Sequence, residues 1–147
     1  MYESVKILDR IIIAPPMGAI YQRLGFRKKA TQISDDARKE TDRHIEEARS
    51  LIALKGLYLR LAVSGNDGQT IILEGGLSFS SAKLATFLGT SREAILMGAT
   101  AGNVIMEAIR EKTNRQEMAA AVVYDATASE MADAALDWIT GFINRQI

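Results

Sequence analysis

Four polar side chains late in the sequence stand at four-residue intervals: Asp125, Ser129, Asp133 and Asp137. Steps of four keep side chains near one face of an α-helix, so a continuous helix would present three carboxylates and a hydroxyl as one stripe. Such a stripe could bind a ligand or a partner protein, and a basic group nearby would relieve the mutual repulsion of the carboxylates. The competing interpretation is structural: Asp125 caps a second helix, and Asp133 and Asp137 form a solvated face. No metal is expected, because the carboxylates lie along a line and not around a point.

Four further residues could do chemistry elsewhere in the chain. Thr100 and Gly102 stand between a predicted strand and a predicted helix, where free N–H groups can bind an anion; a plain tight turn is the competing interpretation. Arg60, on the outer face of a predicted strand, could contact a carboxylate or phosphate, or could serve solubility alone. Trp138, near the end of the last predicted helix, could be part of the core or could anchor an interface.

The composition excludes several kinds of site. Without cysteine, the chain has no disulfide, thiolate nucleophile, cysteine-ligated zinc or iron–sulfur cluster. The single histidine, His44, is expected to be exposed and has no serine or acid at a spacing that suggests a catalytic triad. We therefore assign no catalytic residue and no metal ligand from the sequence, and we leave open whether the protein is an enzyme.

Length and charge favour a single globular domain over residues 1–147. Of these residues 48% are hydrophobic and 24% are charged, which is ordinary for a chain with one core. With 18 basic and 18 acidic residues, the net charge of zero favours neither nucleic acid nor an anionic membrane. The longest apolar run is cut by Pro15 and Pro16, and the N-terminus has no signal-peptide layout. We expect a cytoplasmic protein that binds neither nucleic acid nor membrane.

Helix signals dominate the first third of the chain. The first fourteen residues could form a strand or a short helix. Pro16 suits the first position of a short helix over 17–24, which Gly25 would end. Ser34 is a good N-cap for the next helix, whose apolar residues recur every three to four positions, and Gly56 would close it.

The pattern then changes to that of strands. Alternating leucines over 57–63, a loop over 64–68 and a second strand over 70–73 predict a hairpin, and Gly75–Gly76 predicts a bulge or a bend. Ser80 or Ser81 would cap a short helix over 82–88 that Gly89 stops.

The last third contains one more predicted strand, buried, over 94–99. Gly102–Asn103 would open the next helix, and residues 116–144 read as helical, either as one helix or broken near Asp125. Helices around a hairpin and one further strand predict an α+β domain with a small, mainly antiparallel sheet covered by helices.

Three blocks in this order carry a resemblance. The first is Tyr21-Gln22-Arg23-Leu24-Gly25-Phe26, followed by the acidic-capped helix and the strand over 57–61. The second is the strand over 94–102, which ends in an Ala-Thr-x-Gly turn, and the third is the stripe of Asp125, Ser129, Asp133 and Asp137. Together, over about 20–146, they resemble the activation domain of cobalamin-dependent methionine synthase and its small stand-alone bacterial members.

The resemblance implies an accessory or docking protein of corrinoid-dependent methyl transfer or reactivation. In that family the domain docks on a cobalamin-carrying domain, whose cobalamin is reduced and remethylated from S-adenosylmethionine. The family holds S-adenosylmethionine largely through a later segment with an Arg-x-x-x-Gly-Tyr or Ser-Pro-Gly-Tyr-Gly type of motif. This sequence has no Gly-Tyr pair, so we expect it to end before that segment and carry over S-adenosylmethionine binding to no residue.

The resemblance thus implies a corrinoid-binding partner, with cobalamin on that partner or S-adenosylmethionine as the possible cofactors. Two alternatives stay open. The chain could be an oligomeric enzyme, or a small-ligand-binding protein, that uses S-adenosylmethionine or a related molecule. It could also be a structural protein that self-associates through the surface the missing segment would cover, and we expect a homo-oligomer.

Overall fold

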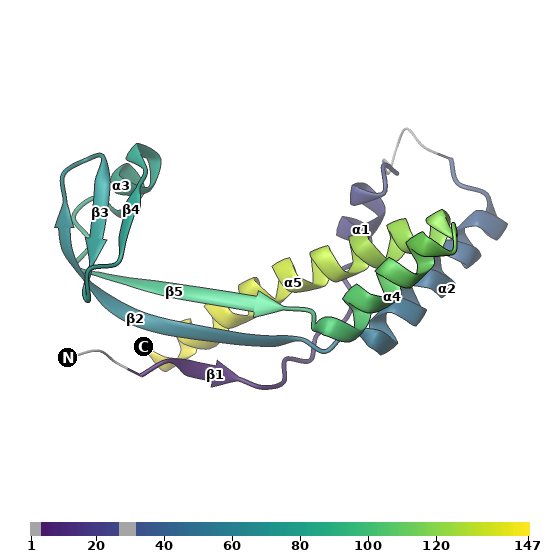
Figure 1. Cartoon of the computed structure of the whole chain (residues 1–147), viewed down its shortest axis with the longest axis horizontal. Coiled ribbons are helices and arrows are strands. Elements are labelled where there is room, and N and C mark those ends of the chain that lie inside the picture. The colour runs from purple at the N-terminus through teal and green to yellow at the C-terminus, as the bar shows by residue number, and fades with distance from the viewer. Residues whose placement is uncertain (1–3, 27–31) are drawn as a thin grey trace. The chain divides into compact units, whose positions relative to one another are not determined.

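The structure, a computed structural model, describes residues 4–26 and 32–147 (Figure 1). The fold is α+β, with a curled antiparallel sheet and a long C-terminal helix, as predicted. Two compact units make up the chain. The sheet unit comprises Met1–Ile7 and Leu57–Gly98, and the helical unit comprises Leu8–Gly56 and Ala99–Ile147.

The sheet has five strands, in the order β1-β2-β3-β4, with β5 also paired to β2. Their bounds are β1 Lys6–Leu8, β2 Lys55–Asn66, β3 Thr70–Leu73, β4 Ser78–Ser80 and β5 Glu93–Thr100. The predicted hairpin is formed by β2 and β3, which pair antiparallel, and the register shifts between Val63 and Gly65. Its turn is held by Asp67, whose Oδ1 accepts hydrogen bonds from the backbone N–H groups of Gln69 (2.8 Å) and Thr70 (2.7 Å). These two bonds lower the pKa of Asp67.

The core of the sheet unit lies where helix α3 (Ala82–Leu88) packs against β3. Its most buried side chains are Leu61, Ile71, Leu73 and Ala85. Ser81 caps α3 by accepting a hydrogen bond of 3.1 Å from the N–H of Leu84, and Gly89 ends the helix at a φ of 53°, both as predicted.

The sheet departs from prediction at two places. Gly75 and Gly76 both have positive φ and turn the chain into β4, a strand that the sequence did not predict. The strand predicted over 94–99 is confirmed as β5, but none of its residues is fully buried and Met97 is 37% exposed. Strand β4 has only three residues, which is too short for an alternation of apolar and polar residues to reveal a strand in the sequence.

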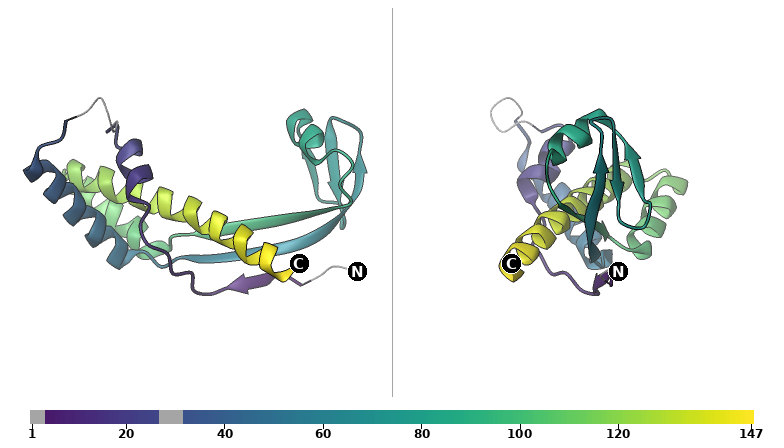
Figure 2. Two further views of the ribbon diagram at one scale, coloured as in Figure 1. Left: turned by 180° about the vertical axis from the view of Figure 1, so that it is seen from behind. Right: turned by 90° about the vertical axis from the view of Figure 1, so that its left-hand side faces the viewer.

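Helices α1 (Met17–Arg23), α2 (Asp35–Leu51) and α4 (Asn103–Asn114) all pack on α5 (Met118–Gln146) (Figures 1 and 2). Ile20, Ile45, Val123 and Ala126 form one buried cluster between α1, α2 and α5. The side of α5 that faces its neighbours is rich in alanine, and small side chains let helix backbones approach closely. The buried alanines of α5 are Ala120, Ala121, Ala126, Ala128 and Ala135.

Most helix boundaries agree with the sequence. Gly25 follows α1 with a φ of 94°, and Ser34 caps α2 by accepting from the N–H of Ala37 at 3.1 Å. The prediction that Gly56 closes α2 is wrong, because the helix ends at Leu51 and Gly56 is buried within β2. Instead of a glycine cap, the extended Ile52 leads the chain out of the helix, and the N–H of Ala53 donates to the carbonyl of Ala101 at 2.9 Å.

The long helix α5 is unbroken at Asp125, which settles the alternative that the sequence left open. Neither proline nor glycine occurs between Met118 and Thr140 to interrupt it. Polar residues within it are compatible with helix: Thr127 is fully buried, and its hydroxyl donates to the carbonyl of Val123 at 2.7 Å inside the same helix.

Candidate functional site: an acidic stripe beside Arg23

The four stripe residues all lie on α5. Asp125, Asp133 and Asp137 are exposed and Ser129 is half-buried, whereas Thr127, Met131, Ala135 and Ile139 are buried on the other side of the helix. Four residues advance about 40° past a full turn, so the stripe winds around the helix and Asp137 is rotated about 120° from Asp125. Ser129 and Asp133, at the centre of the stripe, therefore point in more similar directions from the helix axis than Asp125 and Asp137 do.

A basic group stands beside the middle of the stripe. The Nε of Arg23, from α1, donates to Oε1 of Glu130 at 2.8 Å, and its Nη2 lies 3.9 Å from Oδ2 of Asp133. The hydrogen bond to Glu130 raises the pKa of Arg23, and the negative charges of Glu130, Asp133 and Asp125 add to that shift. This arginine is the neutralising partner that a row of carboxylates requires.

The position of Arg23 depends on how α1 is seated. Ile20 is completely buried in the core of the helical unit, and Tyr21 donates a hydrogen bond from its hydroxyl to Asp42 of α2. The guanidinium carbon of Arg38 lies 5.3 Å from the centre of the Tyr21 ring. Burial first, and then the bond to Asp42, raise the pKa of Tyr21 to about 12. A short helix of seven residues is thus fixed by contacts on two sides.

Sequence reasoning missed Arg23 and Glu130 as members of this site. Arg23 stood within the block Tyr21–Phe26 that carried the resemblance, and Glu130 directly follows Ser129, so both were close to residues already singled out. Their pairing, however, joins positions 107 residues apart in the chain, for which a single sequence carries no local signal.

A second polar cluster connects α2 with α5. The hydroxyl of Tyr124 donates to Oε2 of Glu47 at 2.6 Å, while Nη1 of Arg43 donates to Oε1 at 3.1 Å. Burial, followed by the bond to Glu47, raises the pKa of Tyr124 to about 12, and the bond from Tyr124 lowers the pKa of Glu47. Both partners therefore hold their ordinary charge states at neutral pH, and the cluster fixes the two helices together.

His44 belongs to this cluster, and the expectation that it is exposed is wrong. Only 9% of the residue is accessible, and its ring meets the edge of the Tyr124 ring with centroids 6.3 Å apart. Its Nδ1 lies 3.8 Å from Oε1 of Glu47 and has no hydrogen-bond partner in the part of the chain that the structure describes. The periodicity of α2 could have shown this burial, because His44 stands four positions before the fully buried Ala48.

Three of the other predicted site residues have local partners. Arg60, in the sheet unit, has its Nε 3.8 Å from Oε2 of Glu93. Thr100 accepts a hydrogen bond of 3.1 Å from the N–H of Gly102, which has a φ of 92°. A Cβ on Gly102 would lie 3.3 Å from the carbonyl oxygen of Ala53. The arrangement at Thr100 and Gly102 is therefore that of a tight turn, because the Gly102 N–H is already used.

Trp138 is half-buried on α5. It stacks on Phe142, one helical turn later, with ring centroids 5.5 Å apart and an interplanar angle of 13°. The neighbouring Ile139 and Ile143 are the residues that enter the core. Trp138 thus combines a packed side with an accessible one.

Within residues 4–26 and 32–147, no group of three or more histidine, aspartate or glutamate side chains is arranged to hold a metal ion. None of the described helices is long and apolar enough to cross a membrane. The sequence matches no protein-family model and no curated protein.

Proposed function

We propose that this protein is an accessory protein of corrinoid-dependent methyl transfer or reactivation, which docks on a corrinoid-binding protein. The observation that carries the proposal is the acidic stripe, which stays exposed on α5 with Arg23 beside it. The same residues form the third block of the resemblance to the methionine synthase activation domain, and the α+β fold with its long C-terminal helix is compatible with that resemblance.

The stripe is suited to docking because it is rigid. The opposite side of α5 is buried against three helices, so the carboxylates of Asp125, Asp133 and Asp137 keep fixed spacings along the surface. Exposed charges on a rigid element raise the association rate with a basic partner surface and fix its orientation. In this role the protein positions its partner, and the corrinoid and the methyl donor carry the chemistry.

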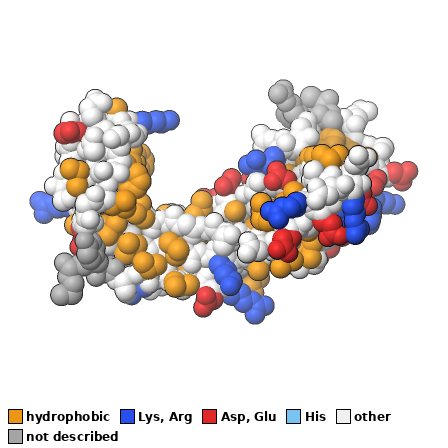
Figure 3. All heavy atoms as spheres, viewed as in Figure 1, with side chains coloured by type: hydrophobic (Ala, Val, Ile, Leu, Met, Phe, Trp, Pro, Cys, Tyr) orange, Lys and Arg blue, Asp and Glu red, His pale blue; other side chains and the backbone are white. Residues whose placement is uncertain are grey.

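The sheet unit also carries exposed apolar side chains. Figure 3 shows hydrophobic side chains gathered on this unit, whereas charges of both signs are interspersed over the helices. The exposed fractions are 83% for Phe87, 43% for Leu77 and 43% for Ile72.

The test is isothermal titration of the protein with a cobalamin-loaded corrinoid-binding domain, and separately with S-adenosylmethionine. A saturable heat of binding with the corrinoid domain supports docking. The double variant Asp125→Asn/Asp133→Asn is expected to bind that domain about tenfold more weakly or worse. Glu107→Gln, which removes an exposed carboxylate from α4, is the matched control and should bind normally. Absence of heat with the corrinoid domain would contradict the proposal.

Titration with S-adenosylmethionine separates docking from the rival function, binding or use of that small molecule by an oligomer. Saturable binding near micromolar concentration would favour the rival, with Asp125 and Asp133 as the first residues to substitute.

Self-association is a second candidate, favoured by the half-buried aromatic pair Trp138 and Phe142. Aromatic side chains with one packed side are frequent in the centre of protein interfaces. Light scattering would show the mass of a dimer or larger oligomer, and Trp138→Ala is expected to shift that mass toward the monomer. A monomer at all concentrations would exclude this candidate.

A further inference from the structure

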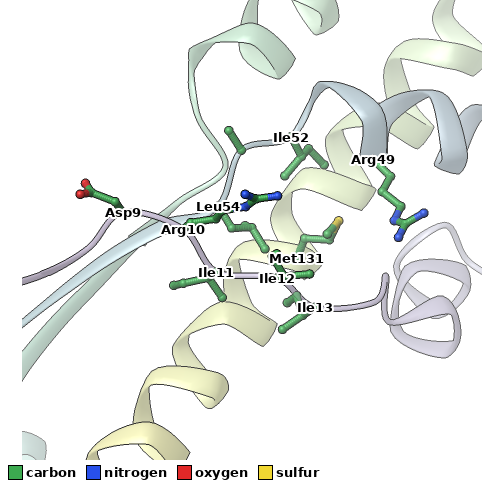
Figure 4. Close-up of a pocket in the computed structure, with 10 residues that line it drawn as sticks. Asp9, Arg10, Ile11, Ile12, Ile13, Arg49, Ile52, Leu54 and Met131 are labelled. Atoms are coloured by element: carbon green, nitrogen blue, oxygen red, sulfur yellow. The ribbon is translucent and has the colours of Figure 1, made fainter.

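A pocket of about 410 Å³ lies in the helical unit (Figure 4), and none of the four stripe residues lines it. One wall is the segment over 9–13, which follows β1. Another is formed by Arg49 and residues 52–54, and Met131 of α5 closes the pocket. The N–H of Ile11 donates to the carbonyl of Leu54 at 3.0 Å, which fixes the two walls to each other. The pocket is therefore part of the folded backbone and not a gap between loose side chains.

Seven of the ten residues that line the pocket are apolar, and three of these are almost completely buried and form its floor. Ile11 is 4% exposed, Leu54 5% and Met131 3%. Met131 is two residues from both Ser129 and Asp133, so it lies about 200° around the helix from each of them. The pocket and the stripe thus use opposite sides of α5.

The rim of the pocket carries two arginines and one aspartate. Arg10 makes no ion pair with any residue in the described part of the chain, and Figure 4 shows its side chain turned toward Leu54 and Met131. The carboxylate of Asp9 points away from the other lining residues in the same view. Arg49 lies on the other side of the pocket, where its Nη1 donates to Oε1 of Glu46 at 3.1 Å and its remaining N–H groups are available.

An apolar floor with guanidinium groups at its edge is the arrangement that recognises an amphipathic acid. Pockets of roughly 300–1,000 Å³ that are mainly apolar and carry a few placed polar groups are typical of small-molecule sites. Guanidinium groups bind carboxylates through strong, charge-assisted hydrogen bonds. We propose that this pocket binds a small organic acid, with its apolar body against Ile11, Leu54 and Met131 and its carboxylate at the rim, where it pairs with Arg10 or Arg49.

This inference is independent of corrinoid docking, and it can be tested without a partner protein. Octanoate serves as the probe and 1-octanol as its neutral counterpart. The chain has six methionines, and among those that the structure describes Met131 alone lines the pocket. In a methyl spectrum of protein labelled on its methionine methyl groups, the Met131 signal is identified by its loss in Met131→Leu, a substitution of similar volume.

The expected result is that octanoate shifts the Met131 methyl signal saturably and that 1-octanol binds more weakly. Arg10→Gln combined with Arg49→Gln should weaken octanoate binding about tenfold, because the charge-assisted bonds are lost. Arg110→Gln, an exposed arginine of α4 outside the pocket, is the matched control and should leave the midpoint unchanged. Both pocket arginines are exposed, so these variants are expected to fold.

Three outcomes would each overturn the proposal. The first is an unmoved Met131 signal at millimolar octanoate. The second is an octanoate titration of the double arginine variant whose midpoint equals that of the parent protein. The third is equal binding of octanoate and 1-octanol. Chemical shifts of the remaining methionines report whether octanoate acts elsewhere on the surface.

Discussion

The hydroxyl of Tyr124 on α5 donates a 2.6 Å hydrogen bond to the carboxylate of Glu47 on α2, across 77 residues of sequence. This bond joins the long helix to the helix that carries His44 and Arg43, and both of those residues also lie close to Glu47. The pair has the shortened length typical of a hydrogen bond to a charged acceptor. It therefore contributes both to stability and to the way stability depends on pH.

Tyr124→Phe is expected to destabilise the protein by about 1–2 kcal/mol, because it removes a part-buried, charge-assisted bond and leaves one carboxylate oxygen without its donor. Urea unfolding followed by circular dichroism measures the change. A double-mutant cycle with Glu47→Gln should give a coupling energy of the same sign. A loss below about 0.3 kcal/mol would mean that water replaces the hydroxyl without cost.

Acidification should weaken the protein through Glu47. The pKa of Glu47 is lowered in the folded state, so the folded chain holds fewer protons than the unfolded chain just below the ordinary value of 4.5. The stability that this carboxylate contributes is present above that pH and is lost as the pH falls through the folded pKa. Between pH 7 and pH 3, the free energy of unfolding should therefore fall more steeply for the parent chain than for Glu47→Gln. Equal slopes would contradict the lowered pKa of Glu47.

Alkali should destabilise the protein through two tyrosines, the half-buried Tyr21 and the buried Tyr124. The pKa values of Tyr21 and Tyr124 are raised to about 12, against an ordinary value of 10.0. Their contribution to stability is present below pH 10 and is lost as the pH rises toward 12. Spectrophotometric titration of the folded protein should show two tyrosines that ionise only well above pH 10. In urea, all tyrosines should ionise near pH 10. An early titration of both residues would show that their hydroxyls are accessible.

Two glycine substitutions should have opposite effects. Gly102→Ala is expected to cost about 1–2 kcal/mol, because alanine would have to adopt a φ of 92° with its Cβ 3.3 Å from the carbonyl oxygen of Ala53. Gly18→Ala, inside α1, has nothing within 4 Å of the added Cβ and should stabilise by about 0.5–1 kcal/mol. Thermal unfolding of the two variants beside the parent provides the comparison. Equal shifts of the midpoint would refute the assignment of strain to Gly102.

Ile20→Ala is expected to destabilise the helical unit by about 2–4 kcal/mol, because Ile20 is fully buried and its loss leaves a cavity between α1, α2 and α5. Arg23 follows on the same helix, so the loosened α1 should also release its contacts with Glu130 and Asp133. Denaturant unfolding gives the first effect, and the NMR signal of the Arg23 Nε–H group reports the second. An unchanged Nε–H signal would show that α1 keeps its place without Ile20.

The features that could be predicted from the sequence were those with local causes. Ser34 and Ser81 cap helices through hydrogen bonds to residues three positions later, and Gly25 and Gly89 end helices through their own backbone angles. Such signals are complete within a few residues, so a single chain reveals them. The alternating leucines of β2 and the turn after them are equally local.

The features that escaped prediction depend on residues far away. Gly56 was expected to end a helix, but glycine is also tolerated in a strand, and the pairing of β2 decides between the two. The three residues of β4 form a strand only because β3 supplies partners such as Ile71 for Phe79. Arg23 could be placed at the stripe only once α1 was seen to pack on α5. The stripe was predicted on one helix face, and what the sequence left open was whether the helix continued through Asp125.

The place of α5 in the chain has a consequence for synthesis on the ribosome. Helices α1 and α2 precede α5 in the chain, yet the cluster that buries Ile20 and Ile45 also requires Val123 and Ala126 of α5. The helical unit therefore cannot complete its core until nearly all of the described chain has left the exit tunnel, whereas β2 to β5 can pair earlier. During that interval the apolar side of the amphipathic α2 lacks part of its cover, and slow translation of residues 118–146 would prolong this exposure.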